Sequence, residues 1–445
     1  MELGQREKLM VVRESAVLVA CLLPNNRSDP HDPLGELRAL ADTAGAIVAD
    51  EVIQNRQKPD AATFIGSGKV RQIAEMVRSQ NADVVIFDND LSPSQIGNVE
   101  EMTECKVLDR SELILDIFAA RARTHEAKLQ VELAQLEYTY PRLRAMWSHL
   151  ERIVGGTPVG IGTRGPGEQQ LEVDRRIVQR KKSELKRQIA HIHQRRRRQV
   201  EARNRDFFTV GLVGYTNAGK STLFNTLTEP AGGGGAFADD KLFATLSTRT
   251  RRWGFGGGDG VMLSDTVGFV RDLPHHLVAS FRATLEEAVH SDLLLVVLDI
   301  SHQRAAQQLD TVMTTLDDIG ATNQQRLVAL NKIDLLEHNG EVMLMQGNLP
   351  DAIPISAQTG AGIEGLTDRV RQTMRGRLRR LQLEVDLKSG RLIQFIESRT
   401  EVVDRRYEEG RAMFTVRIGE NQLERLRALG GGLRIVDGAE GTDGD

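Results

Sequence analysis

The chain has 445 residues, too many for one ordinary domain, and its length indicates about three. Its content of 40% hydrophobic and 27% charged residues is that of an ordinary soluble globular protein. The two cysteines, Cys21 and Cys105, exclude a disulfide framework and lack the spacing of a metal site.

The sequence offers no segment suited to cross a membrane. Its apolar runs, among them residues 16–23 and 293–298, are far shorter than the about 20 residues that span a bilayer. The charged N-terminus lacks the apolar core of a signal peptide. We therefore expect a cytoplasmic protein. This expectation is compatible with a fraction that binds peripherally to a membrane. Nothing signals an oligomer, and a monomer is the default expectation.

The net charge of −4 conceals an uneven distribution of charged residues. Thirteen Lys or Arg residues stand against two Glu between Arg175 and Arg205, whereas the tail after Val436 is acidic and rich in glycine. Such asymmetry indicates a polyanionic partner.

Residues 1–118 are expected to form an N-terminal α/β domain. Apolar segments typical of strands alternate with amphipathic segments typical of helices, the strands at residues 16–23, 47–53, 84–87 and 106–108 and the helices at 36–44 and 70–81. Alternation of this kind predicts a layered α/β structure with a largely parallel sheet.

Residues 119–206 are expected to form a long α-helical hairpin. Apolar residues recur at steps of four and three, as in a heptad seam, at Leu129, Leu133, Leu136, Tyr140, Leu143, Trp147 and Leu150. Pro141 should kink or break this helix. A glycine-rich loop from Gly155 to Gly167 leads to a second helix, over about residues 168–203, with Ile177, Leu185, Ile189 and Ile192 on one side. We expect an antiparallel hairpin that packs on a neighbouring domain.

Residues 207–376 are expected to form a second α/β domain. Apolar strands are predicted at residues 208–213, 261–263, 293–300, 326–330 and 352–355. Between the first strand and a helix at residues 222–227 lies a phosphate-loop motif, whose expected nucleotide-binding residues are Gly214, Tyr215, Thr216, Asn217, Ala218, Gly219, Lys220, Ser221 and Thr222. The alternative, a simple glycine turn, is disfavoured because every fixed position and the context match.

The residues of the phosphate loop have distinct expected roles. Glycines let backbone N–H groups wrap the phosphates at a helix N-terminus. Lys220 would reach the β- and γ-phosphates, and the Ser221 hydroxyl would bind Mg²⁺. After the next predicted strand, Asp265 would hold a Mg²⁺-bound water and Gly268 would offer its N–H to the γ-phosphate. We expect Lys220 and Gly268 to be catalytic.

Base recognition is assigned to Asn331, Lys332 and Asp334, which close the strand at residues 326–330. Guanine presents two donors on one edge, and one carboxylate accepts both, at about 1.5–3 kcal/mol for a charged hydrogen bond. Lys332 would lie along the base plane. Ser356, Ala357 and Gln358 would supply a backbone N–H to the guanine carbonyl. The expected ligand is therefore GTP or GDP, and residues 207–376 are expected to be a P-loop GTPase domain.

Residues 228–252 should bind Mg²⁺ and sense the γ-phosphate. Thr245 is the preferred switch threonine, both as a Mg²⁺ ligand and as a catalytic residue, and Thr248 is the alternative. Residues 232–235, a run of four glycines, should leave this loop disordered without GTP. We therefore expect residues 228–252 to act as a switch that is ordered when the γ-phosphate is bound and disordered when it is absent.

Two residues bear on the rate of hydrolysis. Phe269 stands where some GTPases carry a water-orienting glutamine, so intrinsic hydrolysis should be slow and a partner should complete the site. Asn217 occupies the position where potassium-activated GTPases hold a monovalent cation, which makes K⁺ a hypothetical cofactor. The alternative is that Asn simply suits a tight loop.

Residues 377–445 are expected to form a small C-terminal α+β module with a disordered tail from residue 438. It should contain helices at residues 389–399 and 422–428, and a β-hairpin that turns at Glu409 and Gly410.

Taken together, the chain resembles the HflX family of ribosome-associated GTPases, over about residues 15–376. Beyond the general GTPase motifs, the resembling segments are residues 63–69 (TFIGSGK), 87–93 (FDNDLSP), 128–136 (KLQVELAQL), 162–172 (GTRGPGEQQLE), 242–246 (LFATL) and 265–270 (DTVGFV). Two departures are the sequence STRT after Leu246, where the family tends to have Asp-Pro-Thr, and the glycine insertion at 232–235.

The resemblance implies a GTPase that binds the large ribosomal subunit, is stimulated by it and helps to split stalled or idle ribosomes. It also implies that the hairpin and the loop from Gly155 to Gly167 approach the peptidyl-transferase region.

The residues themselves also favour RNA as partner. Arg195, Arg196, Arg197 and Arg198 share one predicted helix with all but one of the nine further basic residues between Arg175 and Arg205. A solvated helix face is the alternative.

Two other functions remain open. One is an RNA-remodelling NTPase that uses ATP at the N-terminal domain, although Asp334 argues against ATP at the main site. The segment Gly66-Ser-Gly-Lys69 opens a helix there, but Thr63 replaces the first glycine of a phosphate loop. The other is a signalling GTPase with protein-binding flanking domains, which leaves the basic helix unexplained.

Overall fold

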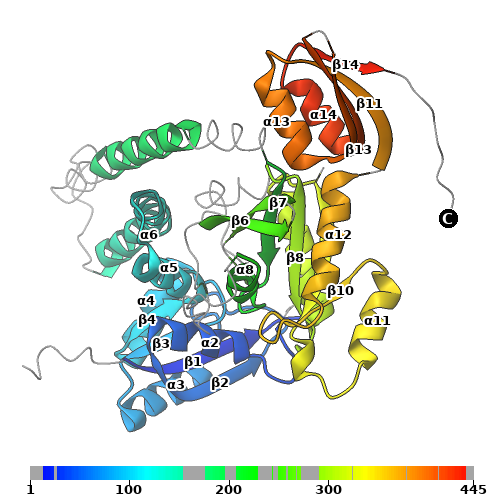
Figure 1. Cartoon of the computed structure of the whole chain (residues 1–445). Coiled ribbons are helices and arrows are strands. Elements are labelled where there is room, and N and C mark those ends of the chain that lie inside the picture. Colours follow the sequence, from blue (N-terminus) through cyan, green and yellow to red (C-terminus); the bar gives the residue numbers. More distant parts are fainter. Residues whose placement is uncertain are drawn as a thin grey trace, which may run out of the picture. The chain divides into compact units, whose positions relative to one another are not determined.

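Figure 1 presents a computed structural model of the chain, which describes residues 14–24, 28–153, 176–195, 207–228, 243, 249–256, 259–266, 268–271, 290–322, 324–376, 378–408 and 410–436. The chain divides into two compact units. The first comprises residues 1–193, 239–247 and 270–283, and the second comprises residues 194–238, 248–269 and 284–445. The four-domain division expected from the sequence is finer than this and stays a prediction.

The N-terminal sheet has the strand order β2-β1-β3-β4, and every pairing in it is parallel. Its strands are β1 (Ser15–Leu22), β2 (Ile47–Asn55), β3 (Val84–Phe87) and β4 (Lys106–Asp109). The helices that accompany it are α2 (Gly35–Ala44), α3 (Ser67–Gln80), α4 (Pro93–Thr103) and α5 (Arg110–Arg121). The predicted parallel α/β layer is therefore confirmed.

Helix α4 was not predicted, although its start carries a clear local signal. Ser92 precedes it, and the Ser92 side chain and Gln95 satisfy each other's backbone N–H groups in a capping box. Pro93 stands at the first helical position, where its missing N–H costs nothing. The capping residues thus explain why α4 starts at Pro93. A search for apolar periodicity does not detect such a cap.

Helix α6 (His125–Ile153) and a helix at residues 176–195 pack against each other. Leu129 and Leu133 of α6 meet Leu185 and Ile189 in one buried cluster, and α6 also packs on α4 and α5, as expected of a hairpin too thin to form its own core. The antiparallel sense of the pair stays a prediction. Residues 155–167 and 196–206 lie outside the described residues.

Two details of this pair differ from the expectation. Pro141 does not break α6, whose helical backbone runs on to Ile153, and the kink at Pro141 stays a prediction. One proline removes a single backbone hydrogen bond, and the turns on either side keep theirs. Ile177 is 57% exposed and does not belong to the apolar face, because the buried cluster begins further along the helix, at Leu185.

The second unit contains a six-stranded sheet with the order β10-β9-β8-β5-β7-β6. The strands are β5 (Thr209–Gly214), β6 (Arg249–Gly256), β7 (Asp259–Asp265), β8 (Leu293–Asp299), β9 (Gln325–Asn331) and β10 (Ile353–Pro354). Helices α8 (Lys220–Thr228), α10 (Ala305–Asp318), α11 (Gly340–Asn348) and α12 (Ile363–Arg375) alternate with them. The short helix η2 (Ile333–Leu335) follows β9. This is the expected α/β domain.

All pairings in this sheet are parallel except that of β6 with β7, which is antiparallel. Strand β6 was not predicted, because its first half lies in the stretch expected to act as the switch. The apolar run at residues 293–298 lies in β8, a central strand that is buried on both faces, as parallel strands usually are. Among the described residues, no helix has the length and apolar character needed to cross a membrane.

The end of the chain forms an antiparallel sheet with the order β12-β13-β11-β14. Its strands are β11 (Leu378–Asp386), β12 (Glu401–Glu408), β13 (Arg411–Gly419) and β14 (Leu433–Val436), with helices α13 (Gly390–Arg399) and α14 (Glu420–Ala428). The hairpin between β12 and β13 passes through Gly410, whose φ is +86°. The α+β module is as predicted; the tail from residue 438 lies outside the described residues.

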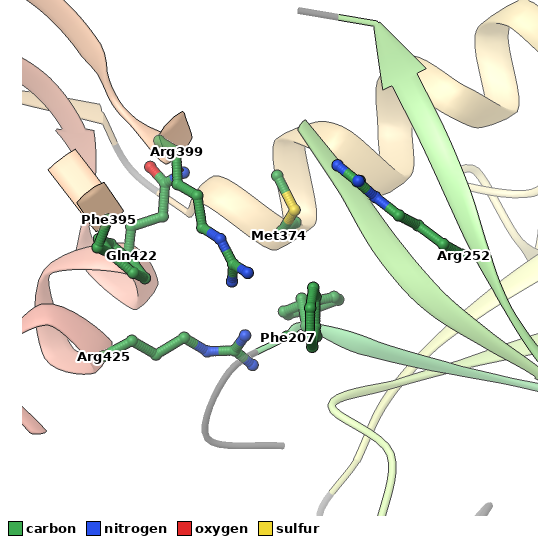
Figure 2. Close-up of a pocket in the computed structure, with 9 residues that line it drawn as sticks. Phe207, Arg252, Met374, Phe395, Arg399, Gln422 and Arg425 are labelled. Atoms are coloured by element: carbon green, nitrogen blue, oxygen red, sulfur yellow. Dashed lines mark hydrogen bonds between the residues drawn. The ribbon is translucent and has the colours of Figure 1, made fainter. Parts of the chain in front are cut away.

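A small cavity within the second unit is lined by arginines and aromatic rings, as Figure 2 shows. The guanidinium of Arg399 lies 4.5 Å from the ring centroid of Phe207, and that of Arg425 lies 5.4 Å from the ring of Phe208. Arg425 also pairs with Asp292 at 2.8 Å. These cation–π contacts join α13 and α14 to the segment that leads into β5.

Candidate nucleotide-binding site

The phosphate loop connects the end of β5 to the start of α8, as the sequence predicts. Within it Gly219 has a φ of +91°, and a Cβ at that position would lie only 2.2 Å from Nδ2 of Asn331. Both the left-handed backbone and the close approach require glycine. Asn217 is also left-handed, with a φ of +60°, and its side chain is exposed. The chain therefore turns sharply around a helix N-terminus, as phosphate binding demands.

Lys220 is the buried cation of this loop. Its Nζ donates hydrogen bonds to the backbone oxygens of Gly214, at 3.1 Å, and Tyr215, at 2.6 Å. Burial lowers the pKa of the Lys220 ammonium from 10.5 to about 8, although the charge of Asp265 works in the opposite direction. An anion bound at the loop would supply the countercharge that the buried ammonium lacks.

Ser221 and Asp265 meet beneath the loop, where the Ser221 hydroxyl donates to the Asp265 carboxylate at 2.9 Å. Asp265 is fully buried at the end of β7, and Thr266 beside it donates to the backbone oxygen of Leu212 at 2.6 Å. A hydroxyl and a carboxylate side by side are the hard oxygen ligands that Mg²⁺ prefers. Mg²⁺ in nucleotide sites is usually bound by one or two protein oxygen ligands together with phosphate oxygens. Ser221 and Asp265 are therefore suited to bind Mg²⁺.

Gly268 lies against the phosphate loop. A Cβ on Gly268 would be 2.8 Å from Nζ of Lys220 and 2.8 Å from Cγ2 of Thr216, so only glycine fits there. The next residue, Phe269, donates from its N–H to the Gly214 oxygen at 3.1 Å and accepts from the Thr216 N–H at 2.7 Å. The Phe269 ring is buried, as expected of a side chain that does not orient water.

Asn331 ties the base-reading motif to the phosphate loop. Its side-chain amide donates to the Ala218 oxygen at 2.8 Å and accepts from the Ala357 N–H at 2.9 Å. One side chain therefore holds together the two loops that were predicted to bind the phosphates and the base.

The other residues predicted to read the base follow β9 and β10. Lys332 has a left-handed backbone with a φ of +67°, and its Nζ pairs with Asp299 at 2.7 Å. Asp334 stands in η2 with an exposed side chain. Ser356 is fully buried and Gln358 is exposed. The Ala357 N–H already bonds Asn331, so a guanine carbonyl would have to share or take over that donor.

Three family descriptions match consecutive parts of the sequence. They are GTP-binding GTPase N-terminal at residues 31–119, GTP-binding GTPase middle region at 121–203, and 50S ribosome-binding GTPase at 209–332. The GTPase HflX of Escherichia coli (strain K12) is 43% identical over 381 residues, which are 85% of this chain and 87% of that protein. The GTPase HflX of Lacrimispora saccharolytica is 40% identical over 405 residues, 90% of this chain and 93% of that protein.

The chain belongs to the HflX family of GTPases. Its activity is therefore the hydrolysis of GTP, and guanine nucleotides are its ligands. A solved GTP-binding protein of the archaeon Sulfolobus solfataricus in complex with GDP is also similar, with 25% identity and a TM-score of 0.43 over 81% of this chain and 98% of that one.

Several residues that the sequence singled out lie outside the described residues. They are Thr245, Thr248, the glycines at 232–235, the loop from Gly155 to Gly167, and Arg196, Arg197 and Arg198. Of the segment 242–246 only Phe243 is described; its ring is buried and contacts Phe118 edge to face at 4.5 Å. Arg195 ends the described part of the basic helix and is exposed.

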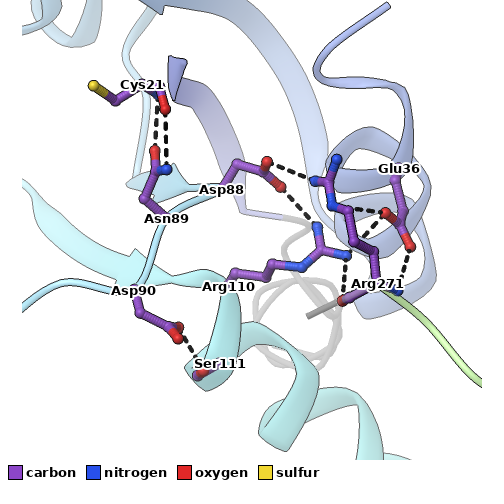
Figure 3. A network of polar contacts seen from close by, with 8 residues as sticks. All are labelled: Cys21, Glu36, Asp88, Asn89, Asp90, Arg110, Ser111 and Arg271. Carbon is purple, nitrogen blue, oxygen red and sulfur yellow. Dashed lines mark hydrogen bonds and ion pairs between the residues drawn. The ribbon is translucent and has the colours of Figure 1, made fainter. Parts of the chain in front are cut away.

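Two residues that adjoin predicted site residues, in a contact or in the sequence, were not anticipated from the sequence. Asp299, at the end of β8, pairs with Lys332. Arg271, three residues after Gly268, joins a buried cluster of charges in the first unit (Figure 3). The only signal for Asp299 was its place at the end of a predicted strand, and nothing local marked Arg271.

Proposed function

We propose that this HflX-family GTPase binds the large ribosomal subunit in its GTP-bound state and separates stalled or idle ribosomes into subunits. One observation carries the proposal. The Asn331 side chain is hydrogen-bonded both to Ala218 in the phosphate loop and to the Ala357 N–H, and it thereby joins the phosphate loop to the base-reading motif. Such a site distinguishes GTP from other nucleotides, and the match to a 50S ribosome-binding GTPase family supports the partner.

The residues of the site would share the work of hydrolysis. The Lys220 ammonium, already beside Gly268, would stabilise negative charge on the γ-phosphate, and the Gly268 N–H would bind one of its oxygens. Ser221 and Asp265 would hold Mg²⁺, which neutralises phosphate charge when bound. Asp334 would accept both donors of guanine. With Phe269 buried where a water-orienting group could stand, the isolated protein should turn over slowly until the ribosome completes the site.

The basic helix would provide the contact with ribosomal RNA. Within residues 176–195, Lys182 and Lys186 pair with Glu137 of α6 at 3.5 and 2.8 Å, and Lys181 pairs with Glu132. These lysines therefore help to attach the helix to α6. Arg180, Arg187 and Arg195 are exposed and, with Arg196, Arg197 and Arg198 beyond, would neutralise RNA phosphates.

Co-sedimentation with isolated ribosomal subunits tests the proposal. Large subunits should retain the protein with a non-hydrolysable GTP analogue and release it with GDP, and intact ribosomes should lose light scattering as they separate. Replacing Arg195, Arg196, Arg197 and Arg198 by Gln should weaken binding and flatten its dependence on salt, because each lost phosphate contact lowers the slope by about one.

A matched variant controls for net charge. Arg379, Arg380, Arg405 and Arg406 are exposed arginines of the C-terminal module, and their replacement by Gln removes the same four charges. This variant should bind as the unchanged protein does. Equal retention of the unchanged protein with GDP and with the GTP analogue would contradict the proposal, and so would wild-type binding and salt dependence in the Arg195–Arg198 variant.

We further propose that Asn217 helps to hold a K⁺ ion beside the phosphates. Its exposed side chain on the phosphate loop supports this, although a left-handed backbone by itself also suits Asn. Turnover should then be several-fold faster in KCl than in NaCl of equal ionic strength, and Asn217→Gly, which keeps the backbone shape, should remove the difference. Equal rates of the unchanged protein in the two salts would reject a potassium site.

A further inference from the structure

Asp299 and Asn331 end two neighbouring strands at the same edge of the six-stranded sheet. Strands β8 and β9 are parallel, and their register places Asp299 beside Asn331. The Ile300 N–H donates to the Asn331 oxygen at 3.0 Å, so the pairing of the strands extends to their ends. Asn331 is also the residue whose side chain holds the phosphate loop. The sheet therefore brings Asp299 next to the base-reading motif, although Asp299 is not part of that motif in the sequence.

The Asp299 carboxylate is held in one orientation by Ser301. Its Oδ1 accepts from the Ser301 hydroxyl at 2.6 Å and from the Ser301 N–H at 3.1 Å. An aspartate that bonds to the backbone two residues further on forms a compact local turn. Because both donors reach the same oxygen, Oδ2 faces a partner outside the turn.

That partner is the ammonium of Lys332. Its Nζ lies 2.7 Å from Oδ2 of Asp299, and the side chains of Lys332 and Asp299 are only 24% and 14% exposed. Ion pairs that are partly covered are screened less by salt than fully exposed pairs. The position of the Lys332 ammonium is therefore set by a residue of β8, although Lys332 itself follows β9.

The backbone end of Lys332 is fixed as well. Lys332 follows Asn331 directly, has a φ of +67°, and accepts from the Leu335 N–H at 3.0 Å. The four-carbon stem of a lysine is flexible when its ammonium has no fixed partner. Here both ends of the stem are held, so it spans from the end of β9 to the end of β8. Such a stem offers an apolar surface while its ammonium stays among polar groups.

We propose that Asp299 is a positioning residue for guanine nucleotides, which holds the Lys332 side chain in the orientation in which its stem packs along the base. The inference rests on the proposed function, in which Asp334 reads guanine, and on the expected place of Lys332 along the base plane. The pair of Asp299 with Lys332 is made within the protein and orders this side chain in advance. A side chain that is already ordered loses less freedom on binding, which raises affinity without a new contact to the ligand.

Equilibrium binding of GDP to the full-length protein tests the inference. Asp299→Asn keeps an acceptor oxygen for Ser301 but removes the charge that holds Lys332. The affinity for GDP should fall about five-fold, which is the scale of ordering one long side chain on binding. A non-hydrolysable GTP analogue should lose the same factor, because both nucleotides carry the same base. In turnover of GTP, KM should rise while kcat changes by less than about two-fold, since the lost interaction is equal in the ground state and the transition state.

A double-mutant cycle separates positioning from a general effect on the fold. Lys332→Ala should weaken GDP binding at least as much as Asp299→Asn does. In the Lys332→Ala background, Asp299→Asn should have no further effect, because Asp299 acts through Lys332. Ser301→Ala, which removes the shorter of the two bonds to Oδ1, should give a smaller loss than Asp299→Asn. Losses that multiply in the double variant would overturn the inference, and so would unchanged or tighter binding of GDP by Asp299→Asn.

Asp317→Asn is the matched control variant. Asp317 ends α10 within the same unit, and it pairs with Arg326 of β9 at 2.5 Å. The substitution therefore also removes the carboxylate of an ion pair with β9, but away from the base-reading motif. It should leave the affinity for GDP unchanged, and a loss equal to that of Asp299→Asn would contradict a specific role of Asp299.

Inosine diphosphate separates failure of this inference from failure of the proposed base reading. It lacks the exocyclic amine of guanine but has the same flat ring system. Asp299→Asn should therefore weaken both nucleotides by the same factor, and an unequal loss would contradict packing along the base. Asp334→Asn should instead reduce the preference for GDP over inosine diphosphate. A preference that survives in Asp334→Asn refutes the base reading, whereas its loss there, combined with normal GDP binding by Asp299→Asn, refutes only the role of Asp299.

Discussion

At the scale of single residues, Lys220 shows what the site requires from a ligand. Its ammonium is buried among backbone oxygens, and this burial lowers its pKa to about 8. A bound triphosphate would favour the charged form and raise the pKa again. Below pH 8 the free protein already carries this proton, so binding needs none. Between pH 8 and 10.5 the free protein has lost it, and binding must take it up.

Nucleotide affinity should therefore be constant from pH 7 to about pH 8 and then fall, by at most about ten-fold per pH unit. Titration calorimetry of GDP binding checks this up to pH 9. The heat should depend on the ionisation enthalpy of the buffer at pH 9 but not at pH 7. Affinity that stays level across this range, without proton uptake, would show that Lys220 is not the group that meets the phosphates.

The residue contacts also show where prediction from sequence stops. The order of the motifs around Lys220, Asp265 and Asn331 indicated the site, because each motif carries its chemistry within a few residues. The bond from Asn331 to Ala218 spans 113 positions, and that from Arg271 to Asp88 spans 183. Such partners are set by tertiary packing, which no local pattern records.

At the scale of elements, periodicity predicted the buried strands and most helices. Strands such as β3 and β8 are continuous apolar runs, because parallel strands are covered on both faces. Periodicity failed where another interaction decides the structure. The capping box of Ser92 begins α4, pairing with β7 creates β6, and packing between the two long helices leaves Ile177 exposed.

At the scale of the whole molecule, the chain combines a guanine-nucleotide site with a basic helix and an N-terminal α/β sheet. The fold class and the HflX family were both predicted from the sequence and are confirmed.

The base specificity of Asp334 tests the central claim, that one frame reads both the phosphates and guanine. With Asp334→Asn, a carboxylate that accepts two guanine donors becomes an amide that can donate to the C2 carbonyl of xanthine. Since hydrogen bonds to a charged group contribute about 1.5–3 kcal/mol each, affinity for GTP should fall at least about 100-fold. Hydrolysis of xanthosine triphosphate should rise above that of the unchanged protein. An Asp334→Asn variant that keeps its preference for GTP would contradict the account.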